Sequence, residues 1–240
     1  MILCLDCGNT RLKWGLLNAD GSWHSRGALP LVQLDILRAA LIDQPPPRRV
    51  IGCNVAGSEN AQRIAAQLEY KPEWITPQRE QCGVKNGYKS PAQLGADRWV
   101  SLIAARELNP GSCLVVNAGT ATTIDLLEAD GRFRGGLILP GLELMRHSLA
   151  HHTADLPLAR AAHAGVPTDT DAAIVSGTLE ATVGAIERMY ARLETQPATC
   201  LLAGGAATEL QPLLHIPLQN VDDLVLRGLA RIALSSSPSP

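Results

Sequence analysis

The sequence predicts an α/β fold made of two related halves. Short apolar segments typical of strands alternate with amphipathic segments typical of helices. An apolar strand that ends in a glycine turn and leads into a second strand occurs at the start of the chain and again near its middle. In both halves a third strand, a helix, a strand and a helix follow, so the 240 residues are expected to form two domains of similar design.

The first half begins with an apolar strand that ends at a Gly-Asn turn. Two further strands flank Asp20-Gly21, a dipeptide typical of hairpin turns. Leucines at spacings of three and four then predict a helix, which ends at three consecutive prolines. The elements expected in this half are strands at 2–6, 11–18 and 22–29, a helix at 31–43, a strand at 49–55, a helix from Ser58, a strand at 74–76, a loop at 77–93 and a helix at 94–108.

The second half repeats this order of elements. Its second and third strands flank Asp130-Gly131, and Pro140-Gly141 precedes its first helix. The expected elements are strands at 113–117, 121–128 and 132–139, a helix after 141, an irregular stretch at 153–168, a helix at 170–193, a strand at 199–203, a helix after 205 and a helix at 222–233.

The local sequences of the two halves also match. Residues 5–10 (LDCGNT) align with residues 116–121 (VNAGTA), so Asp6 corresponds to Asn117 at an offset of 117 minus 6, or 111 positions. This repeat predicts a duplication. We expect an N-terminal domain at 1–111, a C-terminal domain at 112–234 and a disordered tail at 235–240.

Composition excludes several classes of function. A formal net charge of -2 and an aromatic content of 3% do not suit a protein that binds nucleic acid. The sequence contains no apolar run long enough to span a membrane, and its first residues lack the basic region of a signal peptide. We therefore expect a cytoplasmic protein with no membrane partner, whose six cysteines are small buried residues in a reducing compartment.

The first glycine turn carries residues suited to phosphate. In the segment 6–13 (DCGNTRLK), Asn9 and Thr10 can donate hydrogen bonds to phosphate oxygens, Lys13 adds a positive charge, and Asp6 can hold Mg²⁺ directly or through water. The segment 119–123 (GTATT) offers a second such turn with hydroxyl groups. The alternatives are an ordinary hairpin with a surface lysine and a threonine-rich strand. The Gly pair at 204–205 suits an adenosine group and equally suits a plain turn.

A third segment, 88–99 (YKSPAQLGADRW), places a negatively charged residue next to a positively charged residue at the start of a predicted helix. Asp97 and Arg98 project about 100° apart on a helix and therefore address different groups. Arg98 can hold a carboxylate through two hydrogen bonds, and Asp97 can accept a proton from a hydroxyl. The alternative is an Asp favoured by the helix dipole next to a surface Arg.

Together these segments resemble the type III pantothenate kinase family, part of the acetate and sugar kinase, Hsp70 and actin superfamily. The family patterns DxGNTxxK, YxxPxxLGxDR, GTATT, GGxIxPG and TxxAIxxG match, in family order, residues 6–13, 88–98, 119–123, 135–141 and 170–177. The resemblance implies two ribonuclease H-like, actin-like ATPase domains with mixed five-stranded sheets and a cleft between them. It further implies a homodimer that phosphorylates pantothenate with ATP and Mg²⁺, the first step of coenzyme A biosynthesis.

The resemblance also assigns roles to residues. It implies that Asp97 is the catalytic base, that Arg98 pairs with the pantothenate carboxylate, and that Thr170 contacts substrate across the dimer. The pantothenate residues implied are Tyr88, Gly95, Ala96, Asp97, Arg98 and Thr170. The ATP residues implied are Asp6, Cys7, Gly8, Asn9, Thr10, Arg11, Leu12, Lys13 and Thr120, with Asp6 reaching the magnesium ion.

One position departs from the family pattern. Many members have Asp where this chain has Asn117, and that Asp binds a monovalent cation, K⁺ or NH₄⁺. A neutral amide loses the charge that holds the ion, so we expect weak or absent potassium activation. A regulatory or accessory protein of the same fold without kinase activity is the alternative function, and a sugar kinase or phosphatase is disfavoured because residues 88–98 suit a small alcohol that bears a carboxylate.

Overall fold

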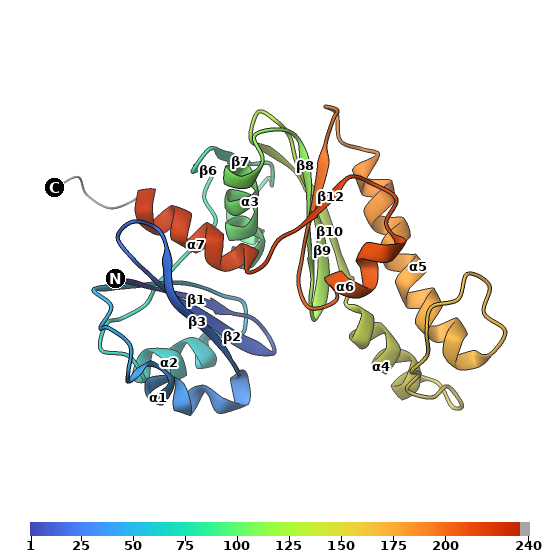
Figure 1. Ribbon diagram of the computed structural model, residues 1–240, viewed down its shortest axis with the longest axis horizontal. Helices are drawn as coiled ribbons and strands as arrows, with labels where there is room; N and C mark the ends of the chain where they lie inside the picture. The colour runs from blue at the N-terminus through green and yellow to red at the C-terminus, as the bar shows by residue number, and fades with distance from the viewer. Residues whose placement is uncertain (236–240) are drawn as a thin grey trace. The chain divides into compact units, whose positions relative to one another are not determined.

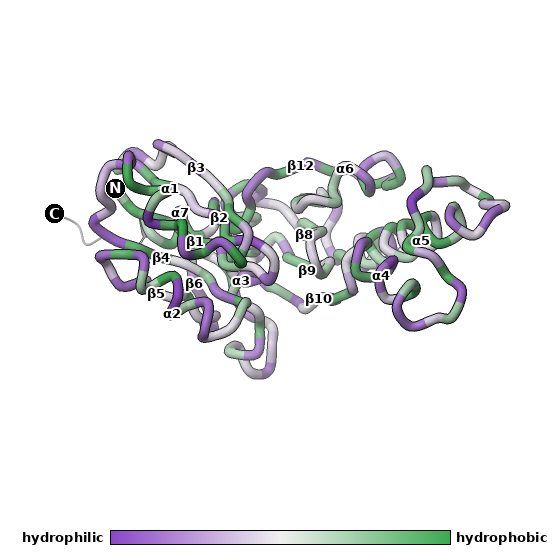
Figure 2. The backbone as a smooth tube through the Cα atoms, turned by 90° about the horizontal axis from the view of Figure 1, so that it is seen from below, coloured by the Kyte–Doolittle hydropathy of each residue, from purple (hydrophilic) through white to green (hydrophobic). Residues whose placement is uncertain are grey.

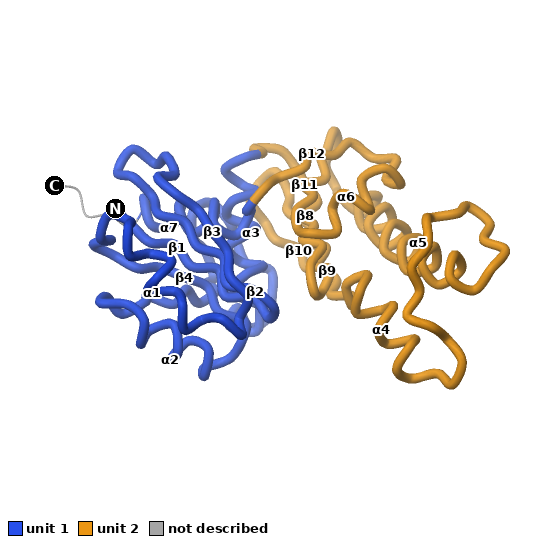
Figure 3. Tube along the Cα trace, turned by 60° about the horizontal axis from the view of Figure 1, so that its bottom comes forward, with its two compact units in different colours: residues 1–108, 223–240 blue, residues 109–222 orange. Residues whose placement is uncertain are grey.

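The computed structural model describes residues 1–235 and has an α/β fold, as predicted (Figure 1). The chain forms two compact units (Figure 3). Unit 1 contains Met1–Leu108 together with the segment that begins at Asp223, and unit 2 contains Asn109–Asp222. The chain therefore leaves unit 1 after residue 108 and returns to it at residue 223.

This division differs from the expected ranges at the C-terminal end. Helix α7, Leu224–Ser235, belongs to unit 1 although the segment that contains it begins at Asp223, 223 minus 108 or 115 positions after Leu108. It packs on helix α3, Ala96–Leu108, and on strand β1, Ile2–Cys7. Ser235, the first residue of the expected tail, closes α7, and the rest of that tail, 236–240, lies outside the described residues.

Unit 1 is built on a five-stranded mixed sheet in the order β3-β2-β1-β4-β5. Strand β1 is antiparallel to β2 and parallel to β4, with Asp6 opposite both Lys13 of β2 and Cys53 of β4. The strands are β1 Ile2–Cys7, β2 Arg11–Leu17, β3 Trp23–Pro30, β4 Arg49–Asn54 and β5 Glu73–Trp74.

Side chains alternate across the sheet of unit 1. Leu3, Leu5 and Cys7 join the core under the first helices, whereas Asp6 points to the other face. The first helical segments are the 3-10 helix η1 Leu31–Ile36, α1 Leu37–Leu41 and α2 Ser58–Ala66. Hydrophobic colouring follows the strands, and much of the connecting loops is hydrophilic (Figure 2).

Unit 2 repeats this arrangement. Its strands run in the order β10-β9-β8-β11-β12, with β8 antiparallel to β9 and parallel to β11. The strands are β8 Cys113–Ala118, β9 Ala121–Leu127, β10 Arg132–Pro140, β11 Thr199–Ala203 and β12 Leu218–Asn220. The helices are α4 Leu142–His152, α5 Thr170–Tyr190, α6 Ala207–Leu210 and the 3-10 helix η3 Gln211–Leu213.

The two units share hydrogen bonds as well as strand order. Ile2 begins β1 and Cys113 begins β8, an offset of 113 minus 2, or 111 positions, which is the predicted repeat. In unit 1 the amide of Gly8 donates to Arg11 O at 3.1 Å, and in unit 2 the amide of Gly119 donates to Ala121 O at 3.1 Å. Equivalent bonds at equivalent turns support a duplication of one ancestral unit.

Two expected elements of unit 1 differ in detail. The segment predicted as one helix at 31–43 is a 3-10 helix, with a kink at Gln33, followed by a short α-helix, and Ile36 at their junction has non-helical backbone angles. The segment expected as a loop at 77–93 contains a small hairpin, β6 Glu80–Gln81 and β7 Val84–Asn86, and a 3-10 turn, η2 Pro91–Gln93.

Five of the six cysteines are buried, as expected, and Cys82 is partly exposed. Burial raises the pKa of Cys4 to about 12 and that of Cys7 to about 11, so both are thiols at neutral pH. Within the described residues no helix is long and apolar enough to cross a membrane.

Candidate active site

The residues of the β1–β2 turn are exposed, and hydrogen bonds fix its two ends. Beyond the bond from Gly8 to Arg11, Leu31 N donates to Thr10 O at 3.1 Å and Val55 N donates to Cys7 O at 3.0 Å. Asn9, Thr10 and Arg11 are exposed. A rigid, open turn of this kind can bind an anion through main-chain amides and short polar side chains.

Two residues of the predicted ATP segment, Cys7 and Leu12, have fully buried side chains in the core of unit 1. Their side chains therefore shape the turn from beneath. Any contact that they make with a ligand must involve their backbone.

Asp6 is the acidic group of this site. Burial of the carboxyl group raises its pKa to about 6. The positive charge of Lys13 and a hydrogen bond from the Cys53 thiol, with Sγ 3.5 Å from Oδ1, act in the opposite direction and lower the pKa. The carboxylates of Asp97 and Asp223 make smaller contributions that raise it. At pH 7 the group is mainly ionised. The charges of Asp97 and Asp223 make the potential at Asp6 more negative, which favours a divalent cation there, so the residues present fit Mg²⁺.

The start of α3 carries the predicted substrate residues. Asp97 lies in the first turn of the helix, where its Oδ1 accepts a hydrogen bond from the Arg98 amide at 2.8 Å. A Cβ atom at Gly95 would lie 2.6 Å from Asp97 Oδ1. The glycine of the segment LGADR therefore leaves room for this carboxylate, which the sequence pattern by itself did not reveal.

Arg98 is held against Tyr88. Its guanidinium NH1 donates to the Tyr88 hydroxyl at 2.9 Å, and its Cζ atom lies 5.7 Å from the centroid of the Tyr88 ring. The Arg98 residue is only 4% exposed. A nearly buried guanidinium with its orientation fixed by a phenol is suited to bind a small carboxylate.

Unit 1 thus brings together segments that are far apart in the sequence. Asp6, Lys13 and Asp97 interact electrostatically, and Tyr88 contacts Arg98 beside them. Thr120, Asn117 and Thr170 belong to unit 2.

The second turn of unit 2 follows Asn117 at the end of β8. The amide of Gly141 donates to Thr120 O at 2.9 Å, which is the counterpart of the bond from Leu31 to Thr10 in unit 1. Thr120 itself is exposed, whereas the hydroxyls of Thr122 and Thr123 are buried without a hydrogen-bond partner. A Cβ atom at Gly204 would overlap the carbonyl oxygen of Ala118, so this glycine is required for the close approach of the turn after β11.

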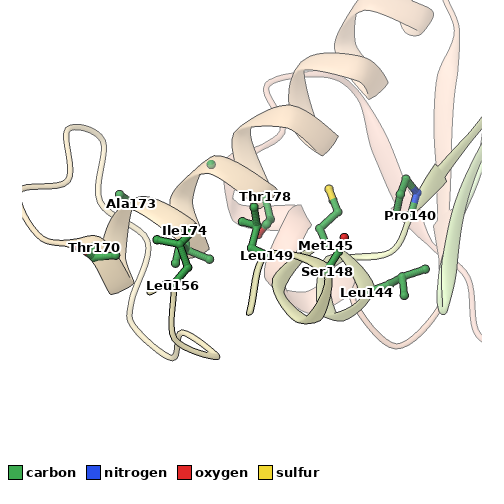
Figure 4. Close-up of a pocket in the computed structure, with 11 residues that line it drawn as sticks. Pro140, Leu144, Met145, Ser148, Leu149, Leu156, Thr170, Ala173, Ile174 and Thr178 are labelled. Atoms are coloured by element: carbon green, nitrogen blue, oxygen red, sulfur yellow. The ribbon is translucent and has the colours of Figure 1, made fainter. Parts of the chain in front are cut away.

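Thr170 is the first residue of α5 and follows the N-cap Asp169, whose carboxylate accepts from Ala172 N at 2.9 Å. It is one of the residues that line a cavity of about 840 Å³, together with Pro140 at the end of β10 and residues of α4, α5 and the segment between them (Figure 4). The other lining residues, among them Leu144, Met145 and Ile174, are mainly apolar.

Three residues beside the candidate site were not predicted from the sequence patterns. Cys53 binds Asp6 from the neighbouring strand, and Arg26 and Asp223 form an ion-pair network with Lys13. The parallel pairing of β1 with β4 could have indicated Cys53. No local pattern marks Asp223, which reaches the site only because α7 folds back onto unit 1.

The fold is that of the sugar kinase and actin-like class. A solved structure from Sinorhizobium meliloti, named a candidate 2-dehydro-3-deoxygalactonokinase, aligns with a TM-score of 0.64 at 18% identity and covers 100% of both chains. At this identity the likeness concerns the fold alone.

The chain belongs to the type III pantothenate kinase family, whose model matches residues 2–192. A type III pantothenate kinase of Aromatoleum aromaticum is 52% identical over 237 residues, which cover 97% of this chain and 98% of the relative. A type III pantothenate kinase of Dechloromonas aromatica is 47% identical over 240 residues, with 98% and 100% covered.

Proposed function

We propose that the protein transfers the terminal phosphoryl group of ATP to pantothenate and forms 4'-phosphopantothenate, the first step of coenzyme A biosynthesis. Membership of the family supports the reaction. The observation that carries the assignment of the site is that Asp97, the Arg98–Tyr88 pair and the phosphate turn all belong to unit 1, where the charge of Asp97 raises the pKa of Asp6. The carboxylate that accepts the proton of the substrate hydroxyl and the turn that binds phosphate would then lie in the same unit.

In this proposal ATP binds to the segment 6–13 and to Thr120. Lys13 and the turn amides bind phosphate oxygens, and Asp6 holds Mg²⁺, which neutralises phosphate charge when bound. Pantothenate binds to Tyr88 and to Gly95, Ala96, Asp97 and Arg98, with its carboxylate on Arg98.

Asp97 acts as the general base. As the primary hydroxyl oxygen of pantothenate bonds to the γ-phosphorus, its proton passes to the Asp97 carboxylate, and the bond from phosphorus to the bridging oxygen breaks to release ADP. A loose transition state of this kind needs mainly positioning and charge neutralisation. The Arg98 amide bond to Oδ1 fixes the direction of the carboxylate.

A coupled assay of ADP formation with and without pantothenate tests the function. We expect ADP formation to require pantothenate. ADP formation that pantothenate does not stimulate would favour the accessory role without kinase activity.

Replacement of Arg98 by glutamine is expected to raise the KM for pantothenate by about 10- to 100-fold, the value of a charge-assisted hydrogen bond to a carboxylate. Because the lost contact is with the carboxylate, the variant should also lose its preference for pantothenate over pantothenyl alcohol, which lacks that group. Steady-state kinetics with pantothenate and with pantothenyl alcohol as substrates measures this preference. Arg231→Gln, which affects an exposed ion pair with Glu107 at 3.4 Å, is the control, and an unchanged preference in Arg98→Gln would contradict the assignment.

Potassium is expected to have little effect on the rate. Asn117 offers an amide where a carboxylate would hold the ion, and a neutral ligand binds a monovalent cation more weakly. Assays in sodium, potassium and ammonium salts at equal ionic strength measure this. Strong activation by potassium or ammonium would show that other groups bind the cation, and Asn117→Asp is expected to introduce or increase the dependence.

We also propose a cytoplasmic homodimer in which Thr170 contacts substrate across the interface. The apolar cavity beside Thr170 and the exposed Leu144 and Ile138 support a surface that a second copy covers. Sedimentation velocity tests the dimer, and a monomer at assay concentrations would exclude a role of the interface in activity.

A further inference from the structure

Asp223 bridges two cations on neighbouring strands of unit 1. Its Oδ2 lies 2.9 Å from NH1 of Arg26 on β3, and its Oδ1 lies 3.4 Å from Nζ of Lys13 on β2. The Asp223 side chain is 27% exposed and those of Lys13 and Arg26 are 40% and 43% exposed. The carboxylate is therefore more shielded than either cation that it binds.

The backbone at Asp223 adopts an unusual conformation. Its φ is +51°, in the left-handed region, which Asp and Asn tolerate better than other residues that have a side chain. Its carbonyl accepts the amide of Arg227 at 3.0 Å, at the start of α7. Strained backbone of this kind is often found at functional sites, and here it occurs at the residue whose carboxylate reaches Lys13.

The two ion pairs are unequal. Both contacts are hydrogen bonds, but the bond from Arg26 is 2.9 Å long and the bond from Lys13 is 0.5 Å longer, 3.4 minus 2.9 Å. Arg26 can therefore hold the Asp223 carboxylate in place while the Lys13 ammonium retains freedom to bind a further anion. Lys13 lies opposite Asp6 across β1 and β2, on the strand that leaves the turn, so the network borders the phosphate turn.

We propose that Asp223, anchored by Arg26, is a positioning residue that holds the Lys13 ammonium where ATP phosphates bind. This inference rests on the proposed function, because it takes Lys13 as a phosphate ligand. Without Asp223 the long lysine side chain samples more rotamers, and its ordering must then come from the free energy of ATP binding. The opposite role, in which Asp223 competes with phosphate for Lys13, is an outcome that the test can reveal.

The test compares Asp223→Asn with the parent chain. Asn tolerates the left-handed backbone and removes only the charge, so the variant is expected to fold. We expect the KM for ATP to rise about two- to five-fold, the usual value of a partly exposed ion pair, with kcat and the KM for pantothenate unchanged. In a chain that carries Lys13→Met, Asp223→Asn should have no further effect on ATP binding, because the partner through which it acts is absent.

Glu194→Gln is the matched control. Glu194 bridges Arg132 and Arg134 of unit 2 at 2.8 and 3.2 Å, a similar arrangement away from the phosphate turn, and its loss should leave the KM for ATP unchanged. An unchanged or lower KM for ATP in Asp223→Asn, or an equal rise in the Lys13→Met background, would overturn the proposal.

Equilibrium binding of a non-hydrolysable ATP analogue, measured by calorimetry without pantothenate, separates this inference from the reaction. A parent chain that binds the analogue but does not phosphorylate pantothenate would contradict the proposed function. A two- to five-fold weaker binding of the analogue by Asp223→Asn would still support the positioning role.

Discussion

Replacement of Asp97 by asparagine is expected to lower kcat for pantothenate phosphorylation by about 10²- to 10⁴-fold, the usual contribution of general base catalysis. Asparagine has the same shape, and its carbonyl oxygen can still accept the Arg98 amide, so the first turn of α3 should not change. It cannot accept the proton of the substrate hydroxyl. The KM values for ATP and pantothenate should change much less than kcat, since the lost interaction belongs to the transition state.

The control for this prediction is Asp130→Asn. Asp130 also accepts a local backbone amide, from Arg132 N at 3.0 Å, but lies in the exposed β9–β10 turn. Its variant should retain full activity. A kcat for Asp97→Asn within about ten-fold of the parent value would show that proton removal does not depend on this carboxylate.

The sequence predicted the parts of the site that lie in continuous segments. Asp6 and Lys13 lie on two strands joined by a tight turn, and the length of this turn places them opposite each other across β1 and β2. Likewise, Asp97 and Arg98 follow from a helix start after Gly95. In each case the geometry depends on neighbours within a few residues.

The parts that were not predicted depend on contacts over long sequence distances. The helix at 222–233 was assigned to the second domain because the repeat runs in sequence order, yet α7 packs on α3 of unit 1. Asp223 therefore reaches Lys13 across 210 positions. The hairpin of β6 and β7 was overlooked because its strands have two and three residues, too few for an alternating pattern.

The packing of α7 on α3 determines the second large effect, which is expected for Gly228→Ala. A Cβ atom at this position in α7 would overlap the carbonyl oxygen of Val100 in α3. Because that atom belongs to a helix backbone, it cannot rotate away as a side chain would, and the two helices must separate. Overpacking of this kind costs about 1–3 kcal/mol or more, which exceeds the gain of about 1 kcal/mol in helix propensity from Gly to Ala.

Unfolding in guanidinium chloride, followed by tryptophan fluorescence, reports this effect from the relevant unit. All four tryptophans, Trp14, Trp23, Trp74 and Trp99, belong to unit 1. Gly184→Ala in α5 is the control, since a Cβ atom there meets nothing within 4 Å and the substitution should be neutral or slightly stabilising for unit 2.

The same substitution connects helix packing to the reaction. Val100 follows Asp97 by three residues in α3, nearly one helical turn, so a shift of α3 at Val100 displaces the base and Arg98 together. Gly228→Ala should therefore lower kcat/KM for pantothenate as well as the unfolding midpoint, whereas Gly184→Ala should leave the midpoint of the fluorescence transition unchanged. A parent-like midpoint for Gly228→Ala would mean that α7 and α3 can separate at no cost, and the close contact of these helices would then have no part in holding Asp97.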